Sequence, residues 1–195
     1  MKIKYIIPVV ALMCLQSAMA GIETVNFQSK EDLLRVLKGV IVEAPDGEIE
    51  AKVPVVRVVQ NDLDGGDGKS DGGVQINSLS LGGKYGAQMF LGKAAAADSK
   101  LTVSTNVFNV NASYVSYEVQ LFNKTDKKVL ATSGMKRLQK KQDSIEETVK
   151  FSYKLTKDDL GDEIYVRWVQ ISTDSISRDL YVDNVSVVSE GVTPK

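Results

Sequence analysis

The segment Val115-Ser116-Tyr117-Glu118-Val119-Gln120-Leu121 alternates strictly between apolar and polar residues. Because successive side chains of a β-strand point to opposite faces, this period of two predicts a half-buried strand. Its apolar residues belong to a core, and Glu118 and Gln120 share its outward face. It is the clearest strand in the chain, and the stretches on either side of it resemble it.

Short apolar or alternating runs recur along the chain and are separated by turn signals such as Pro45-Asp46-Gly47. This spacing is typical of an antiparallel β-sandwich. One helix is expected at residues 29–39, where a capping box precedes apolar residues at helical spacing and a glycine ends the pattern. The basic stretch 136–143 is expected to be a solvated loop. Further strands are expected at residues 22–27, 39–43, 48–59, 74–81, 85–91, 101–110, 128–131, 149–155, 164–172 and 180–188.

The amino terminus has the pattern of a cleavable signal peptide. Lys2 and Lys4 precede an apolar run over residues 5–15, and Ala18-Met19-Ala20 supplies the small residues of a cleavage site. The run is too short to span a bilayer, and no later stretch approaches a transmembrane length. A buried first helix, or a lipoprotein acylated at Cys14, is a weaker alternative. We therefore expect residues 1–20 to be a signal peptide and residues 21–195 to form a single domain.

The composition excludes several kinds of chemistry. The chain has no histidine, so Ser-His-Asp hydrolysis and histidine-ligated zinc are excluded. Cys14 is the only cysteine, so the exported domain would have no disulfide, which suits a bacterial periplasm or exterior. Removing Lys2 and Lys4 from 24 Lys+Arg leaves 22 against 25 Asp+Glu, a net charge of −3. This mildly acidic balance argues against nucleic acid and anionic membranes as partners.

Three segments resemble known sequences. They are Asp179-Leu180-Tyr181-Val182-Asp183-Asn184-Val185-Ser186-Val187, Gly82-Gly83-Lys84-Tyr85-Gly86-Ala87-Gln88-Met89-Phe90 and Leu160-Gly161-Asp162-Glu163-Ile164-Tyr165-Val166-Arg167-Trp168. They are similar to strands of galactose-binding-like jelly rolls, notably carbohydrate-binding module families four, nine and twenty-two. The usual opening Asn-Gly-Gly-Phe-Glu motif is missing, as is a tryptophan before the penultimate hairpin. The resemblance implies an all-β jelly roll, here with one short N-terminal helix, and more weakly sugar binding.

The closing strand has an irregular pattern, because Val182 and Val185 lie three residues apart and cannot share a face without a bulge at Asp183-Asn184. The resemblance implies a structural calcium ion held by Asp183, with Glu23 of the first strand as a companion. The alternative is that Asp183 only caps the bulge. A second calcium site is expected less strongly in the Asp- and Gly-rich segment, which suits hard oxygen ligands but also any flexible turn. Its candidate ligands are Asp62, Asp64, Asp67 and Asp71.

Sugar binding requires an aromatic ring for stacking and planar polar groups for the hydroxyls. Trp168 is the only tryptophan and Gln170 shares its face, so these two residues could line one concave sheet together with Glu118 and Gln120. The alternative that Trp168 is a core residue beside Ile164 and Val166 is favoured. Glycan cleavage would require two carboxylates that converge in one cleft, and no spacing in the sequence requires such a pair. Glu146 and Glu147, for example, are neighbours in a strand and would point to opposite faces.

The sequence therefore predicts an exported, non-catalytic domain that binds a glycan or polysaccharide. The alternative is a structural or adhesive envelope protein that has the same fold without a sugar site. An enzyme that cleaves glycans with carboxylates alone is a third and more distant hypothesis.

Overall fold

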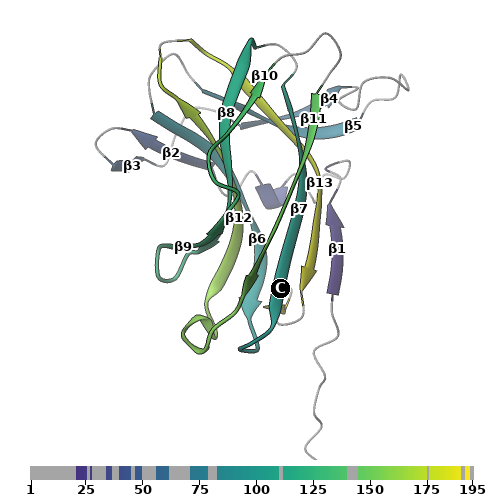
Figure 1. Ribbon diagram of the computed structural model, residues 1–195, viewed down its shortest axis with the longest axis vertical. Helices are drawn as coiled ribbons and strands as arrows, with labels where there is room; N and C mark the ends of the chain where they lie inside the picture. The colour runs from purple at the N-terminus through teal and green to yellow at the C-terminus, as the bar shows by residue number, and fades with distance from the viewer. Residues whose placement is uncertain are drawn as a thin grey trace, which may run out of the picture.

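The computed structural model describes two antiparallel β-sheets packed face to face (Figure 1). The described residues are 21–25, 27, 34–36, 40–44, 47–49, 56–61, 71–78, 83–109, 112–139, 145–174, 176–189 and 192–193. The predicted signal peptide lies outside these residues. None of the described helices is long and apolar enough to cross a membrane.

Within the described residues the first sheet has six strands in the order β11-β7-β13-β5-β4, with β1 also paired to β13. The closing strand β13 pairs with β5 along its first half and with β1 along its second half, so the first strand and the closing strand are neighbours. The strands are β1 (Gly21–Val25), β4 (Val56–Asn61), β5 (Asp71–Asn77), β7 (Lys100–Asn109), β11 (Ile145–Lys154) and β13 (Asp179–Ser189).

The second sheet has eight strands among the described residues, in the order β10-β8-β12-β6-β2-β3, with β9 paired to β8 and β14 to β6. Its centre is formed by β8 (Tyr114–Asn123), β12 (Glu163–Ser172) and β6 (Gly83–Ala94). The others are β2 (Val40–Ala44), β3 (Gly47–Ile49), β9 (Lys128–Thr132), β10 (Lys136–Gln139) and β14 (Val192–Thr193).

Alternating apolar residues of both sheets form one continuous core. From β8 the core receives Val115, Tyr117, Val119 and Leu121, the residues that the sequence assigned to it. From β12 it receives Ile164, Val166 and Trp168, and β7 and β13 supply valines and leucines from the opposite sheet. The all-β sandwich predicted from the sequence is therefore confirmed.

The predicted bulge in the closing strand is also confirmed. Asp183 pairs with Asn106 and Ser186 with Ser104, so β13 has one more residue than β7 between these two pairs. Asn184 has a φ of 47°, in the left-handed region that asparagine tolerates better than most residues. The extra residue turns Val182 and Val185 to the same side, and both are fully buried.

Two segments differ from the sequence-based expectation. Residues 136–139 form strand β10 instead of a loop, because Leu138 packs into the core while this short polar segment pairs with the edge of β8. The single strand expected at residues 48–59 is two strands, β3 and β4, which belong to different sheets. Of the predicted helix, residues 34–36 are described and are helical, and Val36 is buried.

Candidate functional site

The outer face of the second sheet carries the polar side chains that alternate with the core residues. Pairing of β12 with β6 and β8 places these side chains in rows across the three central strands. One row contains Gln88, Arg167 and Gln120, and the next contains Phe90, Tyr165 and Phe122. We call these six residues, together with Glu118 from the following row, the Arg167 face: Gln88, Phe90, Glu118, Gln120, Phe122, Tyr165 and Arg167.

The polar row is held in place by its own contacts. Arg167 donates a hydrogen bond from Nε to Oε1 of Gln88 at 3.1 Å, and its guanidinium carbon lies 3.1 Å from the centroid of the Phe122 ring. The exposed fractions of Gln88, Arg167 and Gln120 are only 8%, 7% and 9%. A guanidinium that is already stacked and hydrogen-bonded has little conformational freedom left to lose when a ligand binds. The row is therefore preorganised.

Two residues of the aromatic row are more accessible than the polar row. Phe90 and Tyr165 are half-buried, with ring centroids 5.1 Å apart at an interplanar angle of 56°. The Tyr165 hydroxyl donates to Glu163 at 3.3 Å, and the Lys124 ammonium lies 5.2 Å from the centre of the ring. Burial raises the pKa of Tyr165, and the neighbouring Glu163 carboxylate raises it further, so the hydroxyl stays protonated at neutral pH.

Glu118 lies at the side of the polar row, opposite Val169. Its carboxylate accepts a hydrogen bond from the Thr132 hydroxyl of β9, and its side chain is half-buried. The outward orientation predicted for Glu118 and Gln120 from the alternation of β8 is therefore confirmed.

A second polar group lies at the end of this face, where β8 begins. Asp174 accepts two hydrogen bonds from Arg178, from Nη1 at 2.6 Å and from Nη2 at 2.9 Å. The Arg178 guanidinium lies 4.3 Å from the centre of the Tyr114 ring, and that of Arg137 lies 3.6 Å from it. Hydrogen bonds from Arg178, then from the backbone N–H of Ile176, lower the pKa of Asp174 to about 2.

Trp168 and Gln170 lie on the opposite face of β12 from Arg167. Trp168 is fully buried, packs edge-on against Phe27 at a centroid distance of 6.3 Å, and donates from Nε1 to the Thr105 hydroxyl at 3.2 Å. Gln170 is also buried and donates to the backbone carbonyl of Arg178 at 2.9 Å. The favoured alternative, that Trp168 is a core residue, is therefore confirmed, and these two residues do not share a surface with Glu118 and Gln120.

The structure describes only part of the proposed calcium ligands. Asp183 is buried at the bulge, where its Oδ1 accepts a hydrogen bond from the backbone N–H of Asn184 at 2.6 Å. This is the capping role given above as the alternative, and Asp183 has further contacts besides. Among the described residues no three acidic side chains gather as a metal site, and calcium stays a prediction. Of the other predicted ligands, Asp62, Asp64 and Asp67 lie outside the described residues, and Glu23 and Asp71 are placed by backbone only.

Sequence reasoning missed Arg167, Gln88, Tyr165 and Phe90. All four belong to segments that were singled out for their resemblance to jelly-roll strands. The available signal was their phase: Arg167 and Tyr165 have the opposite parity to Trp168, so placing Trp168 in the core places them outside.

Comparison with known proteins supports the fold. No protein-family model and no curated protein sequence matches the chain. Among solved structures, a Stig cyclase from Fischerella sp. TAU, in complex with (3Z)-3-(1-methyl-2-pyrrolidinylidene)-3H-indole, is similar with a TM-score of 0.54 and 15% identity. The match covers 80% of this chain and 86% of the cyclase.

Two carbohydrate-binding proteins are similar as well. The CBM27-1 module of Caldicellulosiruptor saccharolyticus, in complex with mannohexaose, has a TM-score of 0.50 and 11% identity over 89% of this chain and 99% of the module. The CBM22-1-GH10 modules of Clostridium thermocellum endo-1,4-beta-D-xylanase 10B, complexed with xylohexaose, have a TM-score of 0.50 and 15% identity. That match covers 80% of this chain and 27% of the xylanase. At these identities the likeness establishes the fold, and the resemblance to carbohydrate-binding modules seen in the sequence is confirmed at that level.

Proposed function

We propose that this protein is exported and binds a glycan on the Arg167 face without catalysing a reaction. The observation that supports the proposal is the adjacency of the two rows. Planar amides can both donate to and accept from sugar hydroxyls, a guanidinium can donate to them, and the aromatic rings beside these groups offer an apolar surface to the C–H face of a pyranose. Rigid strands carry both rows, which keeps the ordering cost of binding low.

The carboxylates of this face argue against glycan cleavage. Glu118 of β8 belongs to the face, Glu163 of β12 accepts a hydrogen bond from Tyr165 beside it, and Asp174 at its end is paired with Arg178. Glu118 lies opposite Val169, six positions from Glu163 along β12, so the backbone positions of Glu118 and Glu163 are separated by about 20 Å at the usual rise of a strand. Glycoside hydrolases need two carboxyl groups about 5 to 9.5 Å apart. A binding role fits this geometry better than a hydrolytic one.

One observation favours the alternative of a structural or adhesive envelope protein. The three residues of the polar row are each less than one-tenth exposed. A ligand that reached them would first meet Tyr165, Phe90 and Glu118, which are half-buried. If these accessible groups bind no sugar, the face serves to stabilise the sheet.

Affinity electrophoresis tests the proposal. The protein, expressed without residues 1–20, is run in native gels containing xylan, mannan or a mixed-linkage glucan. We expect retardation in at least one of them. Tyr165→Ala and Gln88→Ala should abolish or reduce the retardation, because they remove the aromatic surface and a hydrogen-bonding amide. Gln75→Ala is the matched control, since Gln75 is a half-buried glutamine of β5 in the other sheet.

Thermal unfolding of each variant establishes that it is folded before its binding is compared. No retardation in any neutral polysaccharide would overturn the proposal and favour the structural alternative. Equal loss of retardation in Gln75→Ala would show that the Arg167 face is not the site. Release of reducing ends or unsaturated products would show that the protein is an enzyme.

A further inference from the structure

The outer face of the first sheet carries three lysines on strands β7 and β11. Alternation of β7 turns Leu101 and Val103 into the core and leaves Lys100, Thr102 and Ser104 outside. The same alternation in β11 exposes Lys150, Ser152 and Lys154. We call these six residues the lysine face. It belongs to the opposite sheet from the Arg167 face (Figure 1).

Strand register brings two of the lysines together. Lys154 lies directly opposite Lys100, and Lys150 lies opposite Ser104. Lys150 and Lys154 are four residues apart on the same side of one strand, about 13 Å at the usual rise. Between them the hydroxyls of Thr102 and Ser152 are hydrogen-bonded at 3.0 Å. The face therefore presents three ammonium groups around a row of hydroxyls.

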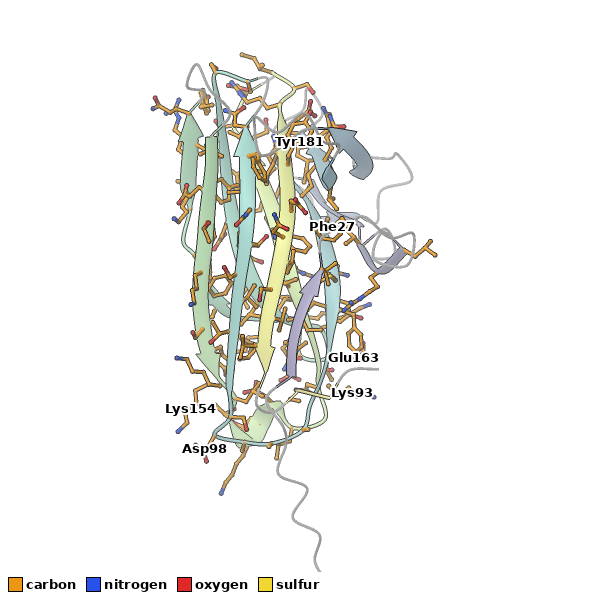
Figure 2. The ribbon with its side chains drawn as sticks, turned by 90° about the vertical axis from the view of Figure 1, so that its right-hand side faces the viewer. Phe27, Lys93, Asp98, Lys154, Glu163 and Tyr181 are labelled. Carbon is orange, nitrogen blue, oxygen red and sulfur yellow. The ribbon has the colours of Figure 1, made fainter. Side chains whose placement is uncertain are left out.

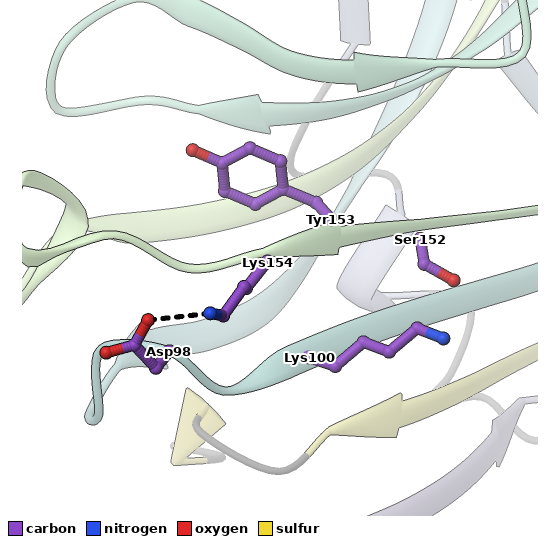
Figure 3. A pocket seen from close by; sticks show the side chains of 5 residues that line it. All are labelled: Asp98, Lys100, Ser152, Tyr153 and Lys154. Atoms are coloured by element: carbon purple, nitrogen blue, oxygen red, sulfur yellow. Dashed lines mark ion pairs between the residues drawn. The ribbon is translucent and has the colours of Figure 1, made fainter.

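A hollow of about 420 Å³ opens at one end of this face, lined by Asp98, Lys100, Ser152, Tyr153 and Lys154 (Figure 3). Lys154 forms an ion pair with Asp98 at 2.8 Å. Figure 2 shows this pair at the opposite end of the sandwich from Tyr181. Neither Lys100 nor Lys150 has an ion-pair partner among the described residues.

The position of Asp98 is fixed by the backbone. Its N–H donates to the carbonyl of Leu155 at 2.8 Å, and the N–H of Leu155 donates to the carbonyl of Ser99 at 2.9 Å. Asp98 has a φ of 65°, in the left-handed region, which aspartate and asparagine enter more readily than most residues. The turn thus holds one carboxylate beside the pair of lysines, where it competes with any other anion for Lys154.

Protection of a sheet edge explains only part of this pattern. Lysines on an edge strand discourage pairing with other chains, and β11 is the outermost strand of its sheet among the described residues. Lys100, however, belongs to β7, which is paired on both sides by β11 and β13. Like charges directly opposite each other on neighbouring strands are destabilising, and Asp98 offsets the repulsion between Lys100 and Lys154 through its ion pair with Lys154 alone.

We propose that the lysine face is a second binding surface, whose ligand is an acidic polysaccharide carrying carboxylate or sulfate groups. Spaced ammonium groups match charges repeated along a polymer, and the serine and threonine hydroxyls match its sugar hydroxyls and anionic oxygens. A single-stranded nucleic acid is a poorer fit, because it needs accessible aromatic rings for base stacking. Phe108 and Tyr181, which the register places on this face, are almost fully buried, and Tyr153 in the hollow is half-buried with its hydroxyl donating to Asp159 at 3.0 Å.

The test measures binding to polygalacturonate, dextran sulfate and uncharged dextran at low and high salt. Wild type should bind one or both anionic polymers and not dextran, and binding should weaken with salt because exposed charges are screened. Lys100→Gln and Lys150→Gln should each weaken binding by about two- to fivefold, the range of an exposed ion pair. Asp98→Asn should tighten binding by a similar factor, since it removes only the competing carboxylate. Binding to polygalacturonate alone would identify carboxylates as the ligand groups. Binding to dextran sulfate alone would identify sulfates.

Lys127→Gln is the matched control, because Lys127 is an exposed lysine in the turn between β8 and β9 of the other sheet. Equal weakening by Lys127→Gln would overturn the proposal by showing that overall charge is responsible. Failure of both anionic polymers to bind better than dextran, or equal binding of single-stranded DNA, would also overturn it. The Arg167 face is separable from this result: Tyr165→Ala should not change acidic-polymer binding, and the lysine variants should not change retardation by neutral glycans.

Discussion

The two outer faces of the sandwich present polar groups in opposite ways. On the Arg167 face the charged group lies in a central strand, is 7% exposed, and is hydrogen-bonded to Gln88 and stacked on Phe122. On the lysine face the charged groups lie on β11 and its neighbour and are exposed, and only Lys154 is in an ion pair among the described residues. The first arrangement fixes geometry, whereas the second supplies long-range attraction that salt screens.

This difference shows where polar side chains contribute to the stability of the fold. Removing the partner of a buried hydrogen-bonded group lowers the free energy of unfolding substantially. An exposed lysine exchanges its contacts for water with little change in that free energy. Substitutions on the Arg167 face should therefore disturb folding and binding together. Substitutions on the lysine face should disturb binding alone.

The largest effect is expected inside the sandwich, on the core side of the strand that carries Arg167. Trp168→Ala should lower the free energy of unfolding by about 3–5 kcal/mol, because it leaves a large cavity and removes the partner of Thr105. Chemical denaturation measures this change. A loss below about 1 kcal/mol would contradict the assignment of Trp168 to the core.

The second prediction compares the stability of variants on the two faces directly. Arg167→Ala should lower the free energy of unfolding by about 1.5–3 kcal/mol, since it removes a charged hydrogen bond to the buried Gln88 amide. Lys150→Ala should change it by no more than about 0.5 kcal/mol, as is usual for exposed residues. Equal losses in the two variants, measured by urea denaturation, would remove the distinction between the faces.

A smaller loss is expected at Gly86, in β6 opposite Val169 on the same face as Arg167. A Cβ at this position would lie 2.6 Å from the backbone carbonyl oxygen of Trp168. Gly86→Ala should therefore push β6 and β12 apart and cost about 1–3 kcal/mol. Gly134→Ala is not a suitable control, because Gly134 has a φ of 69° that favours glycine. Ala87→Gly, at the next position of β6, is used instead to compare the effect of backbone flexibility on stability. Unchanged stability of Gly86→Ala would show that the two strands can separate without cost.

The smallest effect is expected from pH, at the end of the Arg167 face. The pKa of Asp174 is lowered from 3.8 to about 2, chiefly by hydrogen bonds from Arg178. The folded state thus binds the proton less well than the unfolded state, so this stabilisation is present above pH 4 and is lost as the pH falls toward about 2. Urea midpoints measured from pH 5 to pH 2 should fall less steeply in Asp174→Asn than in wild type. Identical slopes would contradict the prediction.

Much of the fold was predictable, because it depends on alternation along single strands. The alternation of β8 correctly identified its core residues and the outward position of Glu118 and Gln120. The odd interval between Val182 and Val185 correctly located the bulge at Asp183 and Asn184. Strand β10 was missed because it is short and largely polar, and it exists only through its pairing with β8.

By itself the sequence determined which residues share one side of a strand, where most of the strands run, and where the closing strand must bulge. The physical reason is local, since pleating alternates side chains whatever the strand packs against. Only the tertiary structure decided which side of β12 faces the core, because both phases carry apolar residues: Val166 and Trp168 in one, Val169 and Ile171 in the other. It also decided that Arg167 meets Gln88 and that Lys100 meets Lys154, since these pairs are more than fifty residues apart and depend on register between strands.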